Sequence, residues 1–469
     1  MIFSSVQFLL FFIVVVAVVL SMQKFGTRKE IKQAFLLAAS YFFYGYWDWR
    51  FCFLMLAMAV IAHVSTKRRE QKFFRVAGIV FPLAILGVFK YFDFFVGSFC
   101  AAFGLARSGM IEIILPVGIS FFTFQSMSYT IDVFKGRQET VDFLKLALYI
   151  AFFPQLVAGP IVKARDFLPQ LDEDRKIRLC NVEKGIQIFV FGLFKKVVLA
   201  DRLSVFVDEV FRSPDAFDAP TLILAVVSYS FQIYFDFSGY SDMAIGSAKI
   251  LGYDFQANFN LPYISRNLTE FWKRWHISLS SWLGQYLYIP LGGNRKGKMR
   301  TYINLMLTMA LGGLWHGANW TFVIWGVLHG LGLCIHKFFA GRVQGSPDSI
   351  PKGNALAGFI SVIATYIFVC FAWIFFRASD FGTAFTIISG IFTWQGGVSH
   401  MFMWSFVAAC VVATGTLAAL VRADGREITG YYPIFSLNTV RGLFVLLLIV
   451  GLICGLAYLG DNPFIYFQF

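Results

Sequence analysis

Two histidines in apolar surroundings are the residues of this sequence best suited to chemistry. His316 lies within the uncharged run 301–335, beside glycines at 312, 313 and 317 that allow a backbone or a ligand to approach closely. A neutral imidazole can take the proton of a hydroxyl group, as general-base catalysis requires. His276 follows a stretch rich in tryptophan and basic residues. Taken alone, each is more typical of a hydrogen-bonded structural histidine than of a catalyst.

Asp236 and Asp242 are the second group of candidates, because they stand with Gln232 among aromatic residues. They are consistent with an acid pair in a cavity. They are equally consistent with carboxylates that hydrogen-bond helix ends, or that pair with Arg266 or Arg274 to fix the fold.

Metal binding is the other chemistry suggested by four histidines between positions 276 and 336. This cluster has no HExxH motif and no histidine pair spaced i, i+4, so we predict no metal site. His329 and His336 are interpreted as packing or interface residues. The seven cysteines are scattered without CxxC spacing, which is typical of small buried hydrophobic residues.

The elements that must position these residues are membrane helices. Of 469 residues, 58% are hydrophobic and only 14% are charged, which excludes a soluble enzyme, a fibrous protein and a disordered chain. A helix needs about 20 residues to cross a hydrocarbon core. With the charge-poor runs between 35 and 160 included, we predict an all-α polytopic membrane protein of about 11 spans. The uncharged stretches near or above this length are 1–23, 219–235, 301–335, 353–376, 381–421 and 442–460.

The basic surplus indicates topology. The chain has 40 Lys and Arg against 27 Asp and Glu, a net charge of +13, and the basic residues lie in short loops. This predicts cytoplasmic loops facing a lipid bilayer, and no nucleic-acid partner. The run 1–23 contains no basic residue and is followed by Lys24 and Arg28, so we expect a first span with an outside N-terminus.

A helix at the membrane surface is expected around His276, where Trp and Arg residues mix. Four apolar residues recur at intervals of three and four, which predicts one helix with an aromatic face: Trp272, Trp275, Leu279 and Trp282. Ser265 or Asn267 is expected to cap it. The sequence contains no internal repeat, so we expect a single integral membrane domain over 1–469. Within it, 1–215 supplies N-terminal helices, 219–340 the histidine segments and 353–469 C-terminal helices.

Three ordered motifs together resemble the membrane-bound O-acyltransferase (MBOAT) family, most closely its bacterial alginate O-acetyltransferase branch. They are FDFSGYSDMAIG, then NFNLPYISRNLTEFWKRWHISLSSWL with YIPLGGNRKG, then GGLWHGANWTFVIWGVLHG. Further matches, such as SYFFYGYWDWRF and FFPQLVAGPIVKARDFLPQ, extend the resemblance over 1–377, and it thins afterwards.

The resemblance implies a funnel-shaped bundle of about 11 transmembrane helices with re-entrant and interfacial helices, its two histidines meeting near the bilayer midplane. It matches His316 to the essential histidine of the family and His276 to its second histidine. The implied reaction transfers an acyl group from a thioester to a hydroxyl, directly, since no nucleophile on the chain is compelling. We expect His316 to take the proton of the incoming hydroxyl or of a relay nucleophile, and His276 with Asn319 to orient the substrate or hydrogen-bond the oxyanion. Further substrate-binding candidates are Trp315, Asp236, Asp242 and Arg274.

The expected donor is acetyl-CoA, a substrate rather than a bound cofactor, whose phosphates should meet the basic cytoplasmic face. The candidates for this contact are Arg295, Lys296, Lys298, Arg300, Lys195 and Lys196. For any single one of them, orientation of the chain and snorkelling to the interface is the more typical role.

The expected acceptor is an exported polysaccharide such as alginate, modified outside the inner membrane of a bacterium. The segments between spans are too short to handle a polymer, so the resemblance suggests a periplasmic SGNH or esterase-like partner. Two other functions remain open: D-alanyl transfer from a carrier protein towards teichoic acid, and a non-enzymatic transporter or scaffold. The N-terminal and LGGNRKG matches argue against the D-alanyl branch.

Overall fold

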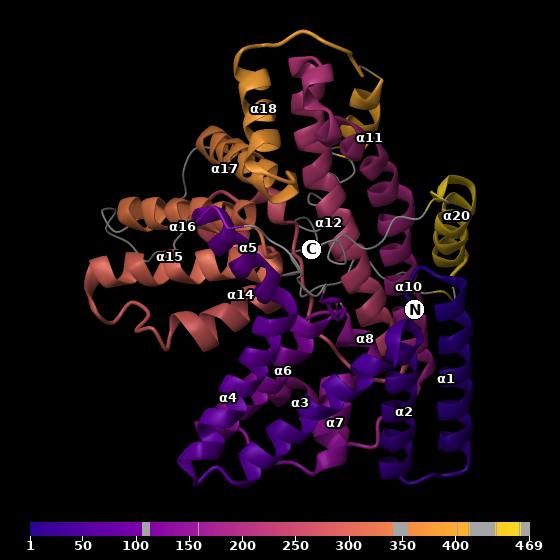
Figure 1. The fold of residues 1–469 in the computed structure, drawn as a ribbon. Coiled ribbons are helices and arrows are strands. Elements are labelled where there is room, and N and C mark those ends of the chain that lie inside the picture. Colours follow the sequence, from indigo (N-terminus) through magenta and orange to yellow (C-terminus); the bar gives the residue numbers. More distant parts are fainter. Residues whose placement is uncertain are drawn as a thin grey trace. The chain divides into compact units, whose positions relative to one another are not determined.

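The structure is a computed structural model that describes residues 1–105, 113–157, 159–340, 355–400, 402–410, 412, 437, 439–458 and 460. The described residues form helices, and the extended pairing among them is one bridge between Phe217 and Val398. The all-α prediction is therefore confirmed for this part of the chain (Figure 1). The chain packs as two compact units that alternate along the sequence. The first unit is Met1–Leu193, Tyr240–Gln256 and Pro433–Val450, and the second is Phe194–Gly239, Ala257–Tyr432 and Gly451–Phe469.

The first unit is a helical bundle built around α6 (Ile119–Phe134), which is buried along nearly its whole length and contacts α3, α4 and α7. Apolar side chains fill this bundle because nearly every helix in it is rich in them. Its other helices are α1 (Val6–Lys24), α2 (Lys29–Asp48), α3 (Arg50–Lys67), α4 (Lys72–Leu86), η1 (Gly87–Tyr91), α5 (Phe92–Ala102), α7 (Phe143–Ala151), α8 (Phe153–Leu156), α9 (Ala164–Asp172) and most of α10 (Leu179–Phe194).

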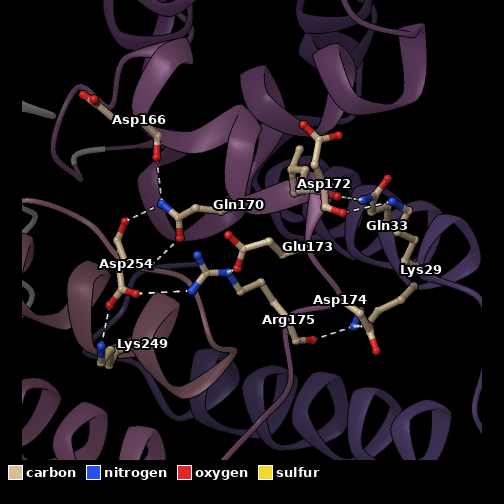
Figure 2. Close-up of polar contacts among 12 residues, drawn as sticks. Lys29, Gln33, Asp166, Gln170, Asp172, Glu173, Asp174, Arg175, Lys249 and Asp254 are labelled. Atoms are coloured by element: carbon tan, nitrogen blue, oxygen red, sulfur yellow. Dashed lines mark hydrogen bonds and ion pairs between the residues drawn. The ribbon is translucent and has the colours of Figure 1, made fainter.

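A network of hydrogen bonds and ion pairs surrounds the connection between α9 and α10 in this unit (Figure 2). Gln33 of α2 donates to the Leu171 carbonyl at 2.7 Å. Arg175 pairs with Asp254, which also exchanges two hydrogen bonds with Gln170 at 2.8 and 2.9 Å. Each exposed ion pair contributes little to the free energy of folding. We therefore expect this network to set the path of the chain between α9 and α10 rather than to add much stability.

The second unit carries both histidine segments. Its elements are η2 (Lys195–Ala200), α11 (Asp201–Arg212), η3 (Pro214–Ala216), the first two thirds of α12 (Ala219–Ile250), η4 (Pro262–Ile264), α13 (Leu268–Arg274), α14 (Ile277–Leu283), η5 (Gly284–Tyr288), α15 (Gly297–His316), α16 (Trp320–Ala340), α17 (Ala355–Arg377) and α18 (Phe381–Phe392). The helix α20 (Val440–Leu456) runs through parts of the sequence assigned to both units.

Glycines bring α15 and α16 into close contact, side by side in Figure 1. A Cβ added to Gly313 would lie 2.2 Å from the carbonyl oxygen of Phe322, and one on Gly326 2.2 Å from that of Met309. No real side chain fits at such distances, so only glycine allows these two backbones to meet. The predicted close approach at Gly313 is thus one of backbone to backbone.

Six described helical segments are long and apolar enough to cross a membrane: Val6–Lys24, Arg50–Lys67, Lys72–Ala102, Ala219–Ile250, Trp320–Phe339 and Ala355–Arg377. Shorter apolar helices are Phe381–Phe392 and Val440–Leu456. The uncharged run 301–335 contains parts of two helices, α15 and α16, as its length predicted. The span count of about 11 stays a prediction, and much of the expected span 381–421 lies outside the described residues.

Candidate active site

The segment around His276 is not the single aromatic helix that the spacing predicted. It forms two short helices, α13 and α14, with His276 between them in the left-handed conformation at φ 42°. Such a backbone costs about 1–3 kcal/mol for a residue other than glycine and persists only where its surroundings enforce it. Asn267 caps α13 as expected, accepting a hydrogen bond from the Glu270 N–H at 2.8 Å. The break presents His276 at the start of a new helix.

Asn258 is the residue that enforces this break. Its side-chain oxygen lies 3.1 Å from Nδ1 of His276 and accepts hydrogen bonds from the N–H and hydroxyl of Ser278 at 3.2 and 2.8 Å. Its carbonyl oxygen accepts from the Ile277 N–H at 2.9 Å. A backbone N–H can only donate, so the shared Asn258 atom is the oxygen, and Nδ1 of His276 must carry its hydrogen. The lone pair of the ring then lies on Nε2.

Burial keeps the His276 ring neutral. The residue is 0% exposed and lies outside the six apolar helices. Burial lowers the pKa of His276 to about 3, because water no longer stabilises the charged ring. In this tautomer Nε2 can accept a hydrogen bond but cannot donate one. The geometry therefore favours the role of orienting a hydroxyl over that of donating to an oxyanion.

His316 ends α15 and is 3% exposed among aromatic rings. Its ring centroid lies 5.0 Å from Trp315, 5.0 Å from Trp325 and 5.2 Å from Phe376. The His276 ring lies 6.4 Å away. At that separation the two rings are close enough to act on one bound group. The structure thus brings together the two histidines, from segments 40 residues apart in the sequence.

Two other predicted site residues are engaged in the fold. Asn319 caps α16, accepting from the Thr321 N–H at 3.0 Å and donating to the Ser379 carbonyl at 2.9 Å. Arg274 pairs with Glu270 at 2.9 Å, one helical turn earlier. Both side chains therefore stabilise the local helices. Their roles towards a substrate stay predictions. Trp315, the neighbour of His316, is buried with its ring 6.0 Å from that of His276.

Asp236 belongs to a buried ion cluster, in which its carboxylate pairs with a lysine. Its carboxylate lies 2.6 Å from Nζ of Lys196, which also donates to Asp201 at 2.7 Å. Burial opposes the charge of Lys196, but the two carboxylates outweigh it and raise the pKa of that lysine. Asp242 lies six residues further along α12, on a different face of the helix, so the helix does not present the two as an acid pair.

The basic candidates for donor binding differ in exposure. Arg295, Lys296, Lys298 and Arg300 are exposed, whereas Lys195 and Lys196 are buried. Since Lys196 is already neutralised by two carboxylates, the exposed group is better suited to meet a polyanion.

Sequence reasoning missed Asn258, whose side-chain oxygen lies against Nδ1 of His276. Asn258 lies 18 positions before His276, and no local pattern in the sequence links the two residues. His329 lies 13 positions after His316 and is 0% exposed. It packs against the rings of Trp272 and Trp325, in line with its interpretation as a packing residue.

Replacing Asn258 by Ala is expected to lower kcat on the order of 100-fold, because the acceptor that fixes the His276 tautomer and ring position is lost. The matched control is Asn260→Ala. The Asn260 backbone N–H bonds to the Arg274 carbonyl at 2.9 Å, a contact that survives substitution. Transfer kinetics on both purified variants check this, and equal rates for the two would contradict the role of Asn258.

The sequence profile of the membrane-bound O-acyltransferase family matches residues 125–376, which is more than half of the chain and includes both histidines. The chain therefore belongs to the MBOAT family. It is an integral membrane O-acyltransferase, as its motifs indicated.

Several proteins of known name are similar to this chain. The probable alginate O-acetylase of Pseudomonas putida is 38% identical over 100% of both chains. The peptidoglycan O-acetyltransferase of Helicobacter pylori is 35% identical, over 79% of this chain and 75% of its own. A teichoic acid D-alanyltransferase of Streptococcus thermophilus is 30% identical, over 47% of this chain and 56% of its own. The similarity to the O-acetylating relatives thus covers more of the chain.

Proposed function

We propose that this protein transfers an acetyl group from acetyl-CoA to a hydroxyl, and thereby supplies acetyl groups for O-acetylation of an exported polysaccharide. The observation that carries the proposal is the pair of buried histidines with ring centroids 6.4 Å apart, in a member of an acyltransferase family. The names of the relatives that match most of the chain support an acetyl group and a glycan acceptor.

The chemistry of the two rings suggests a direct transfer. Nε2 of His276 accepts a hydrogen bond from the incoming hydroxyl and orients it, while His316 removes the hydroxyl proton. The oxygen then attacks the acetyl carbonyl, a C–O bond forms, and the C–S bond of the thioester breaks. The proton held by His316 passes to the leaving thiolate. The products are the acetyl ester and free CoA, and His316 returns to its neutral form.

The donor is expected to bind from the cytoplasmic side. The exposed residues Arg295, Lys296, Lys298 and Arg300 lie at the N-terminal end of α15, which ends at His316. Guanidinium and ammonium groups form strong charge-assisted hydrogen bonds with phosphates. We therefore assign the nucleotide phosphates of acetyl-CoA to this basic segment and the thioester to the other end of the helix.

The acceptor side is expected to face the periplasm of a bacterial inner membrane, with the N-terminus on that side. A periplasmic esterase-like partner would receive the acetyl group on a hydroxyl and deliver it to the polymer. The alternative of D-alanyl transfer has the weaker support, since two teichoic acid D-alanyltransferases match 47% and 56% of this chain, against 79% and 100% for the two O-acetylating relatives.

A transfer assay with labelled acetyl-CoA tests the proposal and its donor site together. In the triple variant Arg295→Gln, Lys296→Gln, Lys298→Gln, the KM for acetyl-CoA is expected to rise about tenfold or more, because charge-assisted hydrogen bonds to phosphate are lost. The KM for acetyl-pantetheine, which lacks the nucleotide phosphates, should not change. An equal rise in KM for both donors would show that the basic segment does not bind the phosphates. Failure of the wild-type protein to transfer acetyl, with transfer of D-alanyl instead, would overturn the proposed donor.

A further inference from the structure

His329 is a buried polar residue that the transfer steps above leave unused. It lies on α16 with 0% of its surface exposed. Among the described residues, neither of its ring nitrogens has a hydrogen-bond partner. Leaving a buried donor or acceptor unsatisfied costs about 1–3 kcal/mol per group, so an imidazole with two such atoms is an expensive packing residue. An aromatic or aliphatic side chain would fill the same volume without this cost.

Two neighbours of His329 also carry buried polar atoms. Its ring lies 5.2 Å from that of Trp272 and 4.8 Å from that of Trp325. The indole Nε1 atoms of both tryptophans are buried and, within the part of the chain that the structure describes, have no hydrogen-bond partner either. The two indole rings lie 5.7 Å apart, so all three rings contact one another. Together they carry four polar atoms without a hydrogen-bond partner among the described residues.

This group of rings adjoins the proposed base. Trp325 contacts His316 edge-on at 5.0 Å and His329 at 4.8 Å, so a single indole separates the two imidazoles. The other rings against His329 are Phe271 and Phe368, at 5.9 and 5.8 Å. Every one of these neighbours is uncharged. The surroundings therefore suit a neutral hydrogen-bonding group and not a phosphate or carboxylate.

We propose that His329, Trp272 and Trp325 form a neutral subsite beside His316 that binds an uncharged amide or hydroxyl group of a substrate. The two indole N–H groups can only donate, and a neutral imidazole both donates and accepts. The complementary group must therefore accept hydrogen bonds and also donate one, which amides and hydroxyls do. His329 is a positioning residue in this scheme, because proton transfer belongs to His316.

The subsite rests on the proposed function, since it places a substrate group next to the proposed base. Two sources supply this chemistry. One is an amide of the pantetheine arm of the thioester donor, and the other is a hydroxyl of the acceptor. The first predicts an effect on the KM of acetyl-CoA, and the second an effect on the KM of the acceptor.

The test uses the full-length protein with His329→Phe, which keeps the ring shape and removes both polar atoms. Because the lost atoms are unsatisfied in the resting protein, this variant should unfold in detergent at the same temperature as wild type or higher. One of the two KM values should rise at least tenfold. His329→Gln, which keeps a donor and an acceptor, should recover most of that loss. The control is His336→Phe on the same helix, whose partly buried ring contacts the Thr269 hydroxyl at 2.9 Å; this change should leave both KM values unchanged.

A lower unfolding temperature in His329→Phe, with Gln failing to restore KM, would show a structural histidine and overturn the subsite. Wild-type kinetics in His329→Phe would do the same. The unfolding temperature does not depend on the identity of the donor. Failure of the proposed function is therefore recognised separately, by a wild-type protein that transfers D-alanyl groups and no acetyl group.

Discussion

Replacing His316 by Gln is expected to lower kcat for acyl transfer about 1,000-fold, within the range of 10² to 10⁴ typical of a lost general base. Glutamine fills much of the space of the imidazole and can hydrogen-bond, but it cannot take a proton at neutral pH. The rings of Trp315, Trp325 and Phe376 around position 316 should therefore keep their packing. Single-turnover transfer from labelled donor measures the effect.

The control for this substitution is His336→Gln, another histidine of the same apolar region, whose ring contacts the Thr269 hydroxyl at 2.9 Å. It should retain wild-type kcat. The unfolding temperature of His316→Gln should stay near that of wild type. A His316→Gln protein that keeps more than half of the wild-type kcat would exclude general-base catalysis by this residue.

Replacing Lys196 by Met is expected to destabilise the protein by about 3–5 kcal/mol, because it leaves two carboxylates buried without their cation. Asp201 and Asp236 lie 2.7 and 2.6 Å from Nζ of Lys196, and all three side chains are no more than 10% exposed. Burial already raises the pKa of Asp201 to about 6, against the opposing effect of the lysine. Without that lysine, both acids must take up protons or draw in water.

The triple variant Lys196→Met, Asp201→Asn, Asp236→Asn separates the cost of unpaired charge from the loss of packing. It should regain much of the lost stability, because no uncompensated charge remains buried. Arg50→Met is the control, since Arg50 also forms an ion pair at 2.6 Å, with Asp48, but its side chain is 60% exposed. That change should be barely detectable. Thermal unfolding in detergent ranks the variants, and equal effects of Lys196→Met and Arg50→Met would contradict the buried cluster.

Local chemistry explains why some features were predictable from residue types and spacing. An uncharged run such as 301–335 must bury its backbone polar groups in helices, and the structure forms α15 and α16 there. Asn267 was predictable as a cap because capping joins residues three apart. The family was readable from the motifs, because they are long and keep their order.

Contacts between distant segments explain what the spacing could not predict. One helix was predicted from the regular spacing of Trp272, Trp275, Leu279 and Trp282. Instead, the hydrogen bonds of Asn258 stabilise His276 in the left-handed conformation, and the segment forms two helices. One interpretation paired Asp236 with Arg266 or Arg274, and the structure pairs it with Lys196 of another helical element. Spacing within a helix carries no information on which distant side chain packs against it.

The sequence by itself determined that this protein is an all-α membrane acyltransferase and made His276 and His316 its candidate catalytic residues, because hydrophobic length and ordered motifs are local properties. Only the tertiary structure decided how those residues can act. It set the His276 tautomer through Asn258, placed the two rings 6.4 Å apart, and gathered His329 with two tryptophans next to His316. The physical reason is that protonation, orientation and unsatisfied hydrogen bonds depend on the burial and neighbours of a side chain, which are fixed only when the helices pack.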